Sequence, residues 1–182
     1  MTSSGKATSQ KKHAAVGSSF FFAVGPGVVA GVVPWLLTRW KIRRPVPGGT
    51  PARAAGAALV GAGAMVLSHS FARFVVDGLG TPVPLAPPRH LVIGGLYRHV
   101  RNPMYVALES AILGQALLLG RPVLLLYGAG WVVPAVTFVR LYEEPTLLRT
   151  FEAEYERYRR NVPGWLPRLR PWRPAAPGPV QD

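Results

Sequence analysis

"LLLGRPVLLL", residues 117–126, joins two apolar stretches through only two residues, Gly120 and Arg121. The first stretch runs from about Met104 to Leu119, and the second runs from about Pro122 to Leu141. Each comes close to the roughly 20 residues that a helix needs to cross a bilayer. So short a connection predicts a tight antiparallel hairpin of two membrane helices. The segments before and after this hairpin must then lie on the same side of the membrane.

Two further apolar stretches lie upstream, at about 18–37 and 54–76. The first contains Pro26 and Pro34, which membrane helices tolerate better than soluble ones do. The second opens with "AAGAALVGAGA", whose small side chains suit close helix contact. The sequence therefore predicts an all-α protein, an integral membrane bundle of four transmembrane helices with a C-terminal helical hairpin and a cytosolic C-terminal helix.

The predicted organisation has four parts along the chain. They are a polar N-terminal tail (1–17), two transmembrane helices (18–76), a core with a loop, the hairpin and the C-terminal helix (77–167), and a Pro-rich tail (168–182). Because 182 residues fit one domain, these parts are expected to form a single unit.

Composition supports a membrane protein and excludes several chemistries. Apolar residues make up 49% of the chain and charged residues only 16%, and the absence of cysteine excludes disulfides and thiolate catalysis. A net charge of +13 would suggest nucleic acid in a soluble protein. Here the basic residues flank apolar runs, where anionic headgroups would meet them. We therefore expect a membrane partner and no nucleic acid, and the four histidines show no spacing typical of a metal site.

The distribution of lysine and arginine predicts the orientation. The segments that share a side with residues 95–105 carry about twice as many of these residues as the opposite segments, which places that side in the cytoplasm. Composition rich in Ala, Gly, Pro and Arg is typical of a GC-rich bacterial genome. The expected location is therefore a bacterial inner membrane, with the active site facing the cytoplasm.

A polar stretch stands at the mouth of the hairpin: "GLYRHVRNPMY", residues 95–105, which we call the knot. On the same side, after the hairpin, the acidic pair Glu143 and Glu144 opens a predicted helix that runs to about Arg160 and should fold back over the mouth. One stripe of this helix is apolar or aromatic at helical spacing: Leu147, Leu148, Phe151, Tyr155 and Tyr158. Taken singly, the basic and aromatic residues of the knot fit headgroup anchors. Together with the acidic pair, they suit a bound cofactor with several charges.

The stretch "HLVIGGLYRHVRNPMY" (90–105), followed by "EEPTLLRTFEAEYERYRRNVPGWLP" (143–167), resembles the isoprenylcysteine carboxyl methyltransferase and phospholipid methyltransferase superfamily. The resemblance covers about residues 80–167. It implies an integral membrane enzyme that uses S-adenosyl-L-methionine to methylate a lipid-like acceptor entering from the bilayer. The first two apolar stretches match only in being apolar.

Carried over by motif, the resemblance implies a set of cofactor-binding residues. They are Arg89, His90, Leu91 and Val92, largely through their backbone, and Tyr97, Asn102, Pro103, Met104, Tyr105, Glu143 and Glu144. Three positions depart from the family pattern, and the smallest change is Ala107, where a glycine is often seen. The usual histidine is Asn102, which cannot titrate, and the glycine after Phe151 is Glu152, which would alter the rim of the site.

Three residues are candidates for the chemistry. Arg101 is held at the mouth, where its guanidinium could reach Glu143, Glu144 or an anionic group of cofactor or substrate. Arg140 lies near the position of a substrate-binding arginine in the carboxyl methyltransferases, although its spacing departs from theirs. Glu109 could take a proton from an amine acceptor or pair with Arg101, or it could reach the interface as a plain surface residue.

Other readings stay open at this point. A membrane reductase of the steroid-reductase type has a similar C-terminal hairpin but uses NADPH, and a non-enzymatic membrane scaffold would use the basic termini as lipid anchors. The "EEP…FEAEY…Y…VP" ending favours the methyltransferase. The sequence leaves the acceptor group open among carboxylate, amine and thiol, and it leaves the oligomeric state undetermined.

Overall fold

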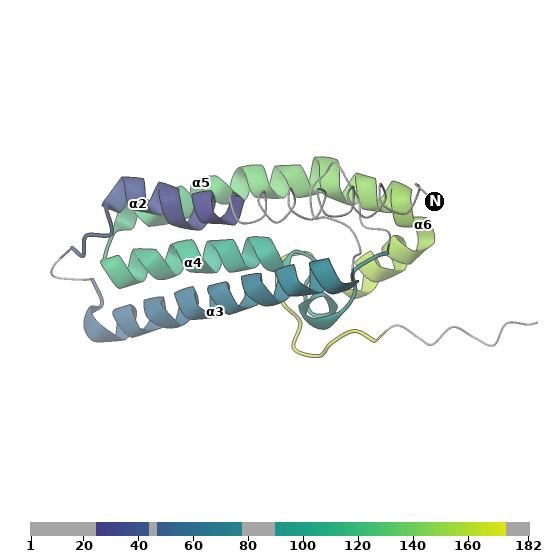
Figure 1. Cartoon of the computed structure of the whole chain (residues 1–182), viewed down its shortest axis with the longest axis horizontal. Coiled ribbons are helices and arrows are strands. Elements are labelled where there is room, and N and C mark those ends of the chain that lie inside the picture. Colours follow the sequence, from purple (N-terminus) through teal and green to yellow (C-terminus); the bar gives the residue numbers. More distant parts are fainter. Residues whose placement is uncertain (1–24, 44–46, 78–89, 174–182) are drawn as a thin grey trace, which may run out of the picture.

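The computed structural model describes residues 25–43, 47–77 and 90–173, and every regular element within them is a helix (Figure 1). In chain order the elements are η1 (Val28–Val32), α2 (Val33–Thr38), α3 (Gly49–Asp77), η2 (Gly95–Arg98), α4 (Pro103–Leu119), α5 (Pro122–Phe138), η3 (Val139–Glu143) and α6 (Glu144–Asn161). No strand occurs within these ranges, which confirms the predicted all-α class. The long helices lie along one axis and form an elongated bundle (Figure 1).

Several predicted segments lie outside the described residues. They are the tail 1–17, residues 18–24 of the first predicted span, most of the proline-rich loop 80–90, and residues 174–182 of the C-terminal tail.

Two helices are long and apolar enough to cross a membrane, namely Gly49–Ser70 within α3 and the continuous helix Pro122–Asn161. The helices Gly25–Thr38 and Pro103–Leu119 are apolar but shorter. On α5, the side chain of Leu126 is 75% exposed. Exposing such a side chain to lipid tails costs little free energy, because the tails are as apolar as leucine itself. The arrangement of four spans stays a prediction for the two shorter helices.

The first described helix contains a proline whose missing N–H is compensated by a neighbouring helix. Pro34 cannot donate to the carbonyl of Ala30, one turn earlier in the chain. The Nε2 of Gln115 on α4 donates to that carbonyl instead, at 2.7 Å. The hydroxyl of Tyr127 on α5 donates to the carbonyl of the preceding residue, Val29, at 2.9 Å. Side chains of α4 and α5 therefore hold this helix against the bundle, in the way that membrane proteins satisfy backbone groups at prolines.

Glycines let α3 and α4 pack backbone to backbone. A Cβ placed on Gly56 would lie 2.6 Å from the carbonyl oxygen of Gly114, and one on Gly63 would lie 2.7 Å from that of Ala107. Gly56 and Gly63 are two turns apart on one face, and their partners are two turns apart in the opposite direction. The helices are therefore antiparallel and in close contact, which confirms the role predicted for the small residues of the second apolar stretch. α3 begins at Gly49 rather than near Ala54.

The connection between α4 and α5 is as short as the sequence suggests. Gly120 ends α4 in the left-handed conformation with φ of 63°, which glycine adopts without steric cost. Pro122 then begins α5 at its first turn, where a missing N–H removes no hydrogen bond. α5 runs back beside α4 (Figure 1). The knot and the residues that follow α5 thus lie at one end of the bundle.

The helix after α5 turns back through a single residue. α5, η3 and α6 form one continuous helix, so the chain does not fold back at Glu144, where the predicted C-terminal helix begins. It changes direction at Glu152, whose φ of 41° and ψ of −115° are not helical. Beyond it, Tyr155 and Tyr158 form a buried cluster with Val162. The other three residues of the predicted stripe pack against this cluster, which confirms the stripe: Leu147, Leu148 and Phe151.

Candidate active site

The knot is folded tightly against the end of α3. Gly95 has φ of +57°, and a Cβ at this position would lie 2.6 Å from the Nε2 of His69 on α3. Only glycine satisfies both constraints. Tyr97 lies on the short helix η2 and is buried, and Val100 is buried in the turn before α4. These contacts fix the backbone from which Arg101 and Asn102 project.

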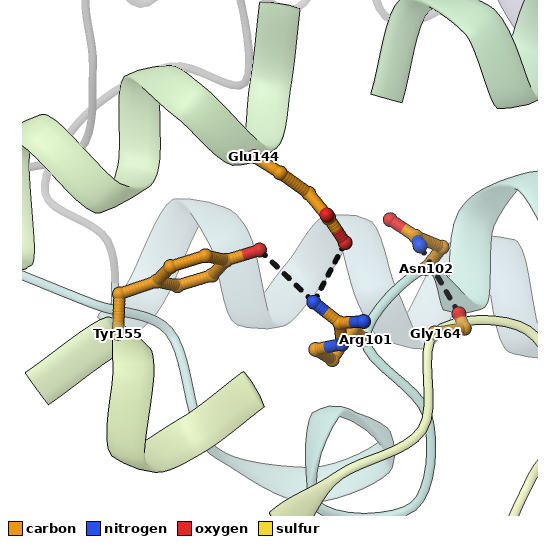
Figure 2. A network of polar contacts seen from close by, with 5 residues as sticks. All are labelled: Arg101, Asn102, Glu144, Tyr155 and Gly164. Atoms are coloured by element: carbon orange, nitrogen blue, oxygen red, sulfur yellow. Dashed lines mark hydrogen bonds and ion pairs between the residues drawn. The ribbon is translucent and has the colours of Figure 1, made fainter. Parts of the chain in front are cut away.

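Arg101 connects the knot to both halves of α6. Its NH1 donates to Oε1 of Glu144 at 2.6 Å and to the hydroxyl of Tyr155 at 3.2 Å (Figure 2). The side chains of Arg101 and Glu144 are only 15% and 21% exposed. In such surroundings a charged pair is shielded from water and its geometry matters more than at a surface. The Nε of Arg101 is buried without a hydrogen-bond partner among the described residues. A buried donor without a partner is uncommon in a folded protein.

The second acidic residue is held by the first turn of α4. The hydroxyl of Tyr105 donates to Oε1 of Glu143 at 2.7 Å. Glu143 lies beyond the apolar stretch 122–141, and burial raises the pKa of its carboxyl. The hydrogen bond from Tyr105 opposes this rise, and the neighbouring Glu144 adds to it. The ionised form of this carboxyl is costly here, and a cation placed beside it would stabilise that form.

Burial and neighbouring acidic groups act in the same direction on the pKa of the Tyr97 phenol. Burial raises the pKa of its phenol above the ordinary value, and Tyr158 and Glu143 raise it further. The phenol is therefore neutral at physiological pH. The carbonyl of Tyr97 accepts a hydrogen bond from the hydroxyl of Tyr158 at 2.7 Å, so α6 is tied to the knot at this point too.

The chain after α6 closes over the knot, and we call residues 162–173 the strap. The backbone N–H of Arg101 donates to the carbonyl of Pro163 at 2.9 Å, and that of Asn102 donates to Gly164 at 3.2 Å. The Nδ2 of Asn102 donates to the same Gly164 carbonyl at 3.0 Å (Figure 2). The side-chain amide of Asn102 thus positions the strap through its Nδ2.

Further along, the strap pairs with the first part of the knot. The backbone N–H of Arg168 donates to the carbonyl of His99 at 3.0 Å, and the Nδ1 of His99 lies 2.8 Å from the carbonyl of Arg168. The backbone N–H of Trp172 donates to the carbonyl of Arg98 at 3.0 Å, and its ring packs on Tyr158. Residues 168–173, expected as the start of a tail, thus form part of this closure.

The predicted cofactor residues separate into three groups. Those brought together around the mouth, through contacts with one another, with Arg101, with α6 or with the strap, are Tyr97, Asn102, Tyr105, Glu143 and Glu144. Pro103 and Met104 begin α4 beside them, and Leu91 and Val92 lead into the knot, with Leu91 packed on the Tyr155 cluster. His90 is exposed, and Arg89 lies outside the described residues.

The three candidates for chemistry occupy different places. Arg101 lies at the mouth of the hairpin, in contact with Glu144 and Tyr155. We call Arg101, Glu144, Tyr155, Tyr105 and Glu143 the polar cluster. Arg140 is exposed on η3, and no hydrogen bond or ion pair among the described residues joins it to Arg101 or the acidic pair. Glu109 lies one turn of α4 beyond Tyr105 and faces α5. There a Cβ on Gly128 would lie 2.6 Å from Oε1 of Glu109, so the glycine makes room for the carboxylate.

The environment of Glu109 is incompletely satisfied. Its Oε2 is buried and has no hydrogen-bond partner among the described residues. A carboxylate within an apolar helix pair is costly, and such residues usually serve function. Because Arg101 is engaged with Glu144, the structure does not show the alternative pairing of Glu109 with Arg101.

Sequence reasoning missed two contributions to the cluster. Tyr155 was expected only as part of an apolar stripe, but its hydroxyl accepts from Arg101. Trp165 was not singled out, but its ring packs on Tyr105 with centroids 6.1 Å apart. A glycine followed by a tryptophan directly after Val162-Pro163 was the available signal, since Gly164 lets the strap approach Arg101.

Comparison with known proteins gives one match. A family model described as phospholipid methyltransferase matches residues 51–154, more than half of the chain. The match runs from the first turn of α3 into α6 and includes the knot, Tyr105 and the acidic pair. No curated protein and no solved structure matches the chain significantly.

Proposed function

We propose a function from one premise: the chain belongs to the phospholipid methyltransferase family, as the resemblance of its motifs predicted. On this basis the protein is a membrane methyltransferase. We further propose that it uses S-adenosyl-L-methionine and methylates a lipophilic acceptor that reaches the site from the bilayer. The observation that carries this proposal is the polar cluster at the end of apolar helices, in which Arg101 and Glu144 meet beside Tyr105 and Glu143.

The residues of the cluster fit the proposed cofactor. Its amino-acid end carries an ammonium and a carboxylate, and the cluster offers one group of each opposite charge. Glu143 uses Oε1 for Tyr105, which leaves its other oxygen for a cation. Arg101 has a buried Nε without a partner among the described residues, which suits a carboxylate. When bound, the cofactor supplies an activated methyl group.

The protein's own part in this reaction is positioning. Arg101, Glu143 and Tyr105 are held by contacts with α6, η3 and the strap, so they would orient the cofactor at the mouth. Correct placement of two reactants can supply about 7–11 kcal/mol of a barrier. The strap and the aromatic side chains around it would exclude water from this end of the bundle.

Glu109 favours an amine as the acceptor group. It lies about 6 Å along the helix axis from Tyr105, toward the apolar part of α4. A carboxylate here would repel a carboxylate acceptor but attract an ammonium. An ammonium must lose a proton before its nitrogen can act as a nucleophile, and the unpartnered Oε2 of Glu109 is an acceptor for it.

The function is tested first by binding. We expect purified protein in lipid nanodiscs to bind S-adenosylhomocysteine in calorimetry and not NADPH. The variants Tyr105→Ala and Glu143→Ala should weaken this binding at least about tenfold while remaining folded. Binding of NADPH instead would favour a reductase, and binding of neither ligand would favour a scaffold. Unchanged binding in both variants would show that the cofactor lies elsewhere.

The acceptor is tested by turnover. Protein in nanodiscs that contain phosphatidylethanolamine should transfer label from radioactive S-adenosyl-L-methionine to the lipid amine. Nanodiscs with a fatty acid or a prenylated cysteine in place of that lipid test a carboxylate acceptor. Label found on a carboxylate would contradict the role of Glu109 and would direct attention to Arg140.

A further inference from the structure

Trp165 belongs to the cluster rather than to the exposed part of the strap. Its side chain is half-buried, whereas Leu166 and Leu169 are 81% and 96% exposed. Its ring packs on Tyr105 with an angle of 56° between the two planes. Tyr105 is the residue that donates to Glu143. An indole, a phenol and a carboxylate are thus placed in succession at the mouth.

The backbone fixes Trp165 in this position. The carbonyl of the preceding residue, Gly164, accepts two hydrogen bonds from Asn102. A Cβ on Gly164 would lie 3.2 Å from the NH2 of Arg101, so the chain passes close to the guanidinium and a larger residue here would crowd it. Two fixed contacts directly before Trp165 leave its indole little freedom to move away. A side chain that serves only as an interfacial anchor needs no such restraint.

We infer that Trp165 and Tyr105 form an aromatic face that recognises the positively charged sulfonium of the cofactor. This inference rests on the proposed function. The faces of aromatic rings carry negative potential, and tryptophan attracts cations most strongly. Glu143 beside Tyr105 adds negative charge at the same place. The sulfonium loses its charge when the methyl group leaves, so this face binds the cofactor before the reaction more strongly than the product after it.

The test compares two ligands that differ in this charge. Affinities of S-adenosyl-L-methionine and of S-adenosylhomocysteine are measured by calorimetry on the parent, Trp165→Leu and Trp165→Phe, all in the same nanodiscs. We expect Trp165→Leu to lose about tenfold in affinity for the charged ligand and less than twofold for the neutral one. The affinity of Trp165→Phe for the charged ligand should lie between those of the parent and Trp165→Leu, because phenylalanine keeps a weaker aromatic face. Retained binding of S-adenosylhomocysteine shows that the variants are folded.

The matched control is Trp172→Leu, which removes the other tryptophan of the strap. Its ring packs on Tyr158, 5.9 Å between centroids, away from Tyr105. We expect this variant to keep the parent's ratio of the two affinities. Equal losses for both ligands in Trp165→Leu, or no loss, would overturn the inference while leaving the proposed function intact. A parent that binds neither ligand would instead overturn the proposed function itself.

Discussion

Arg101 and Glu144 are 43 residues apart in the chain, but NH1 of the first lies 2.6 Å from Oε1 of the second. This pair joins the start of α4 to the start of α6. It depends on the short connection between α4 and α5, which returns the chain to the same end of the bundle. The guanidinium also donates to Tyr155, beyond the turn at Glu152, so a single side chain holds three segments together.

Replacing Arg101 with lysine should slow methyl transfer at least about tenfold, equivalent to about 1.4 kcal/mol of lost transition-state stabilisation. Lysine keeps the charge, but its three donors sit on a flexible stem and lack the rigid planar fork that holds the guanidinium against Glu144 and Tyr155. Turnover is compared in the same lipid at matched protein level. Arg149→Lys, an exposed position on α6, is the control and should be nearly silent. Equal rates for the parent and Arg101→Lys would leave Arg101 as a headgroup anchor.

Replacing Glu152 with glycine should stabilise the protein. Glu152 occupies a backbone conformation with positive φ, which costs a non-glycine residue about 1–3 kcal/mol. The resembling family commonly has glycine at this position, and the turn explains why. We expect the melting temperature in detergent to rise. Glu154→Gly, in the helical part of α6, should lower it because glycine weakens a helix by about 1 kcal/mol. A fall for Glu152→Gly would show that the turn lies elsewhere.

The space that Gly128 leaves for Glu109 can be filled by one methyl group, which would also lie 3.3 Å from Cγ2 of the buried Ile112. In Gly128→Ala the added Cβ meets the end of a flexible side chain, so we expect the carboxylate to move and the melting temperature to change little. Methyl transfer to an amine should fall about tenfold to a hundredfold, because misplacement by about 1 Å can cost that much. Gly130→Ala, where a Cβ would meet no atom within 4 Å, should behave like the parent. Full activity of Gly128→Ala would separate Glu109 from the chemistry.

The contact between α3 and α4 should be sensitive to one methyl group. A Cβ on Gly56 would collide with backbone atoms of α4, which cannot rotate away, so Gly56→Ala should cost about 1–3 kcal/mol. Gly61→Ala on the same helix has no atom within 4 Å and should be neutral or slightly stabilising. Unfolding in detergent measures both variants. Similar melting temperatures for the two would contradict the close packing.

The raised pKa of Glu143 predicts a pH-dependent stability in the absence of cofactor. Because its folded pKa lies above its unfolded value, its contribution to stability is complete below the unfolded pKa and is lost as pH rises through the folded one. Glu143→Gln can keep the hydrogen bond from Tyr105 but carries no charge. We expect the variant to melt above the parent at about pH 8 and to match it near pH 4. A difference that does not grow with pH would contradict the buried carboxyl.

Much of the bundle was predictable because membrane helices can be recognised from the length of their apolar stretches. The apolar stretches placed α4 and α5, the two-residue connection placed them side by side, and small residues marked the face of α3 that meets α4. The turn at Glu152 was not predictable. The residues around it, "FEAEYERY", are strong helix formers, and the reversal is instead associated with packing of Tyr155 and Tyr158 beyond it. The only local sign of the turn in the sequence was Glu152 itself, which stands where the family commonly has glycine.

The candidate site was predictable where charges and motifs carry it, and not where backbone atoms do. Arg101 was expected to reach one of two glutamates, and the structure selects Glu144 for the ion pair and gives Glu143 to Tyr105. The strap pairs with the knot through main-chain groups of Pro163 and Gly164, which every residue type provides. Such pairing does not depend on side-chain type, so the only sign of it in the sequence was Gly164 followed by Trp165, and Trp165 was not singled out. The roles of Arg140 and Glu109 stay predictions.

The pairing of the strap with the knot imposes an order on the making of the protein. Asn102 and its partner Gly164 are separated by 62 positions, so the ribosome delivers the first well before the second. At typical rates of synthesis this interval lasts roughly 3 to 12 s. During that time α4 and α5 can already enter the membrane while the polar groups of the knot still face water. The end of the bundle that carries the candidate site is therefore the last part of the molecule to be completed, and we expect a chain that stopped before the strap to lack the closure over this site.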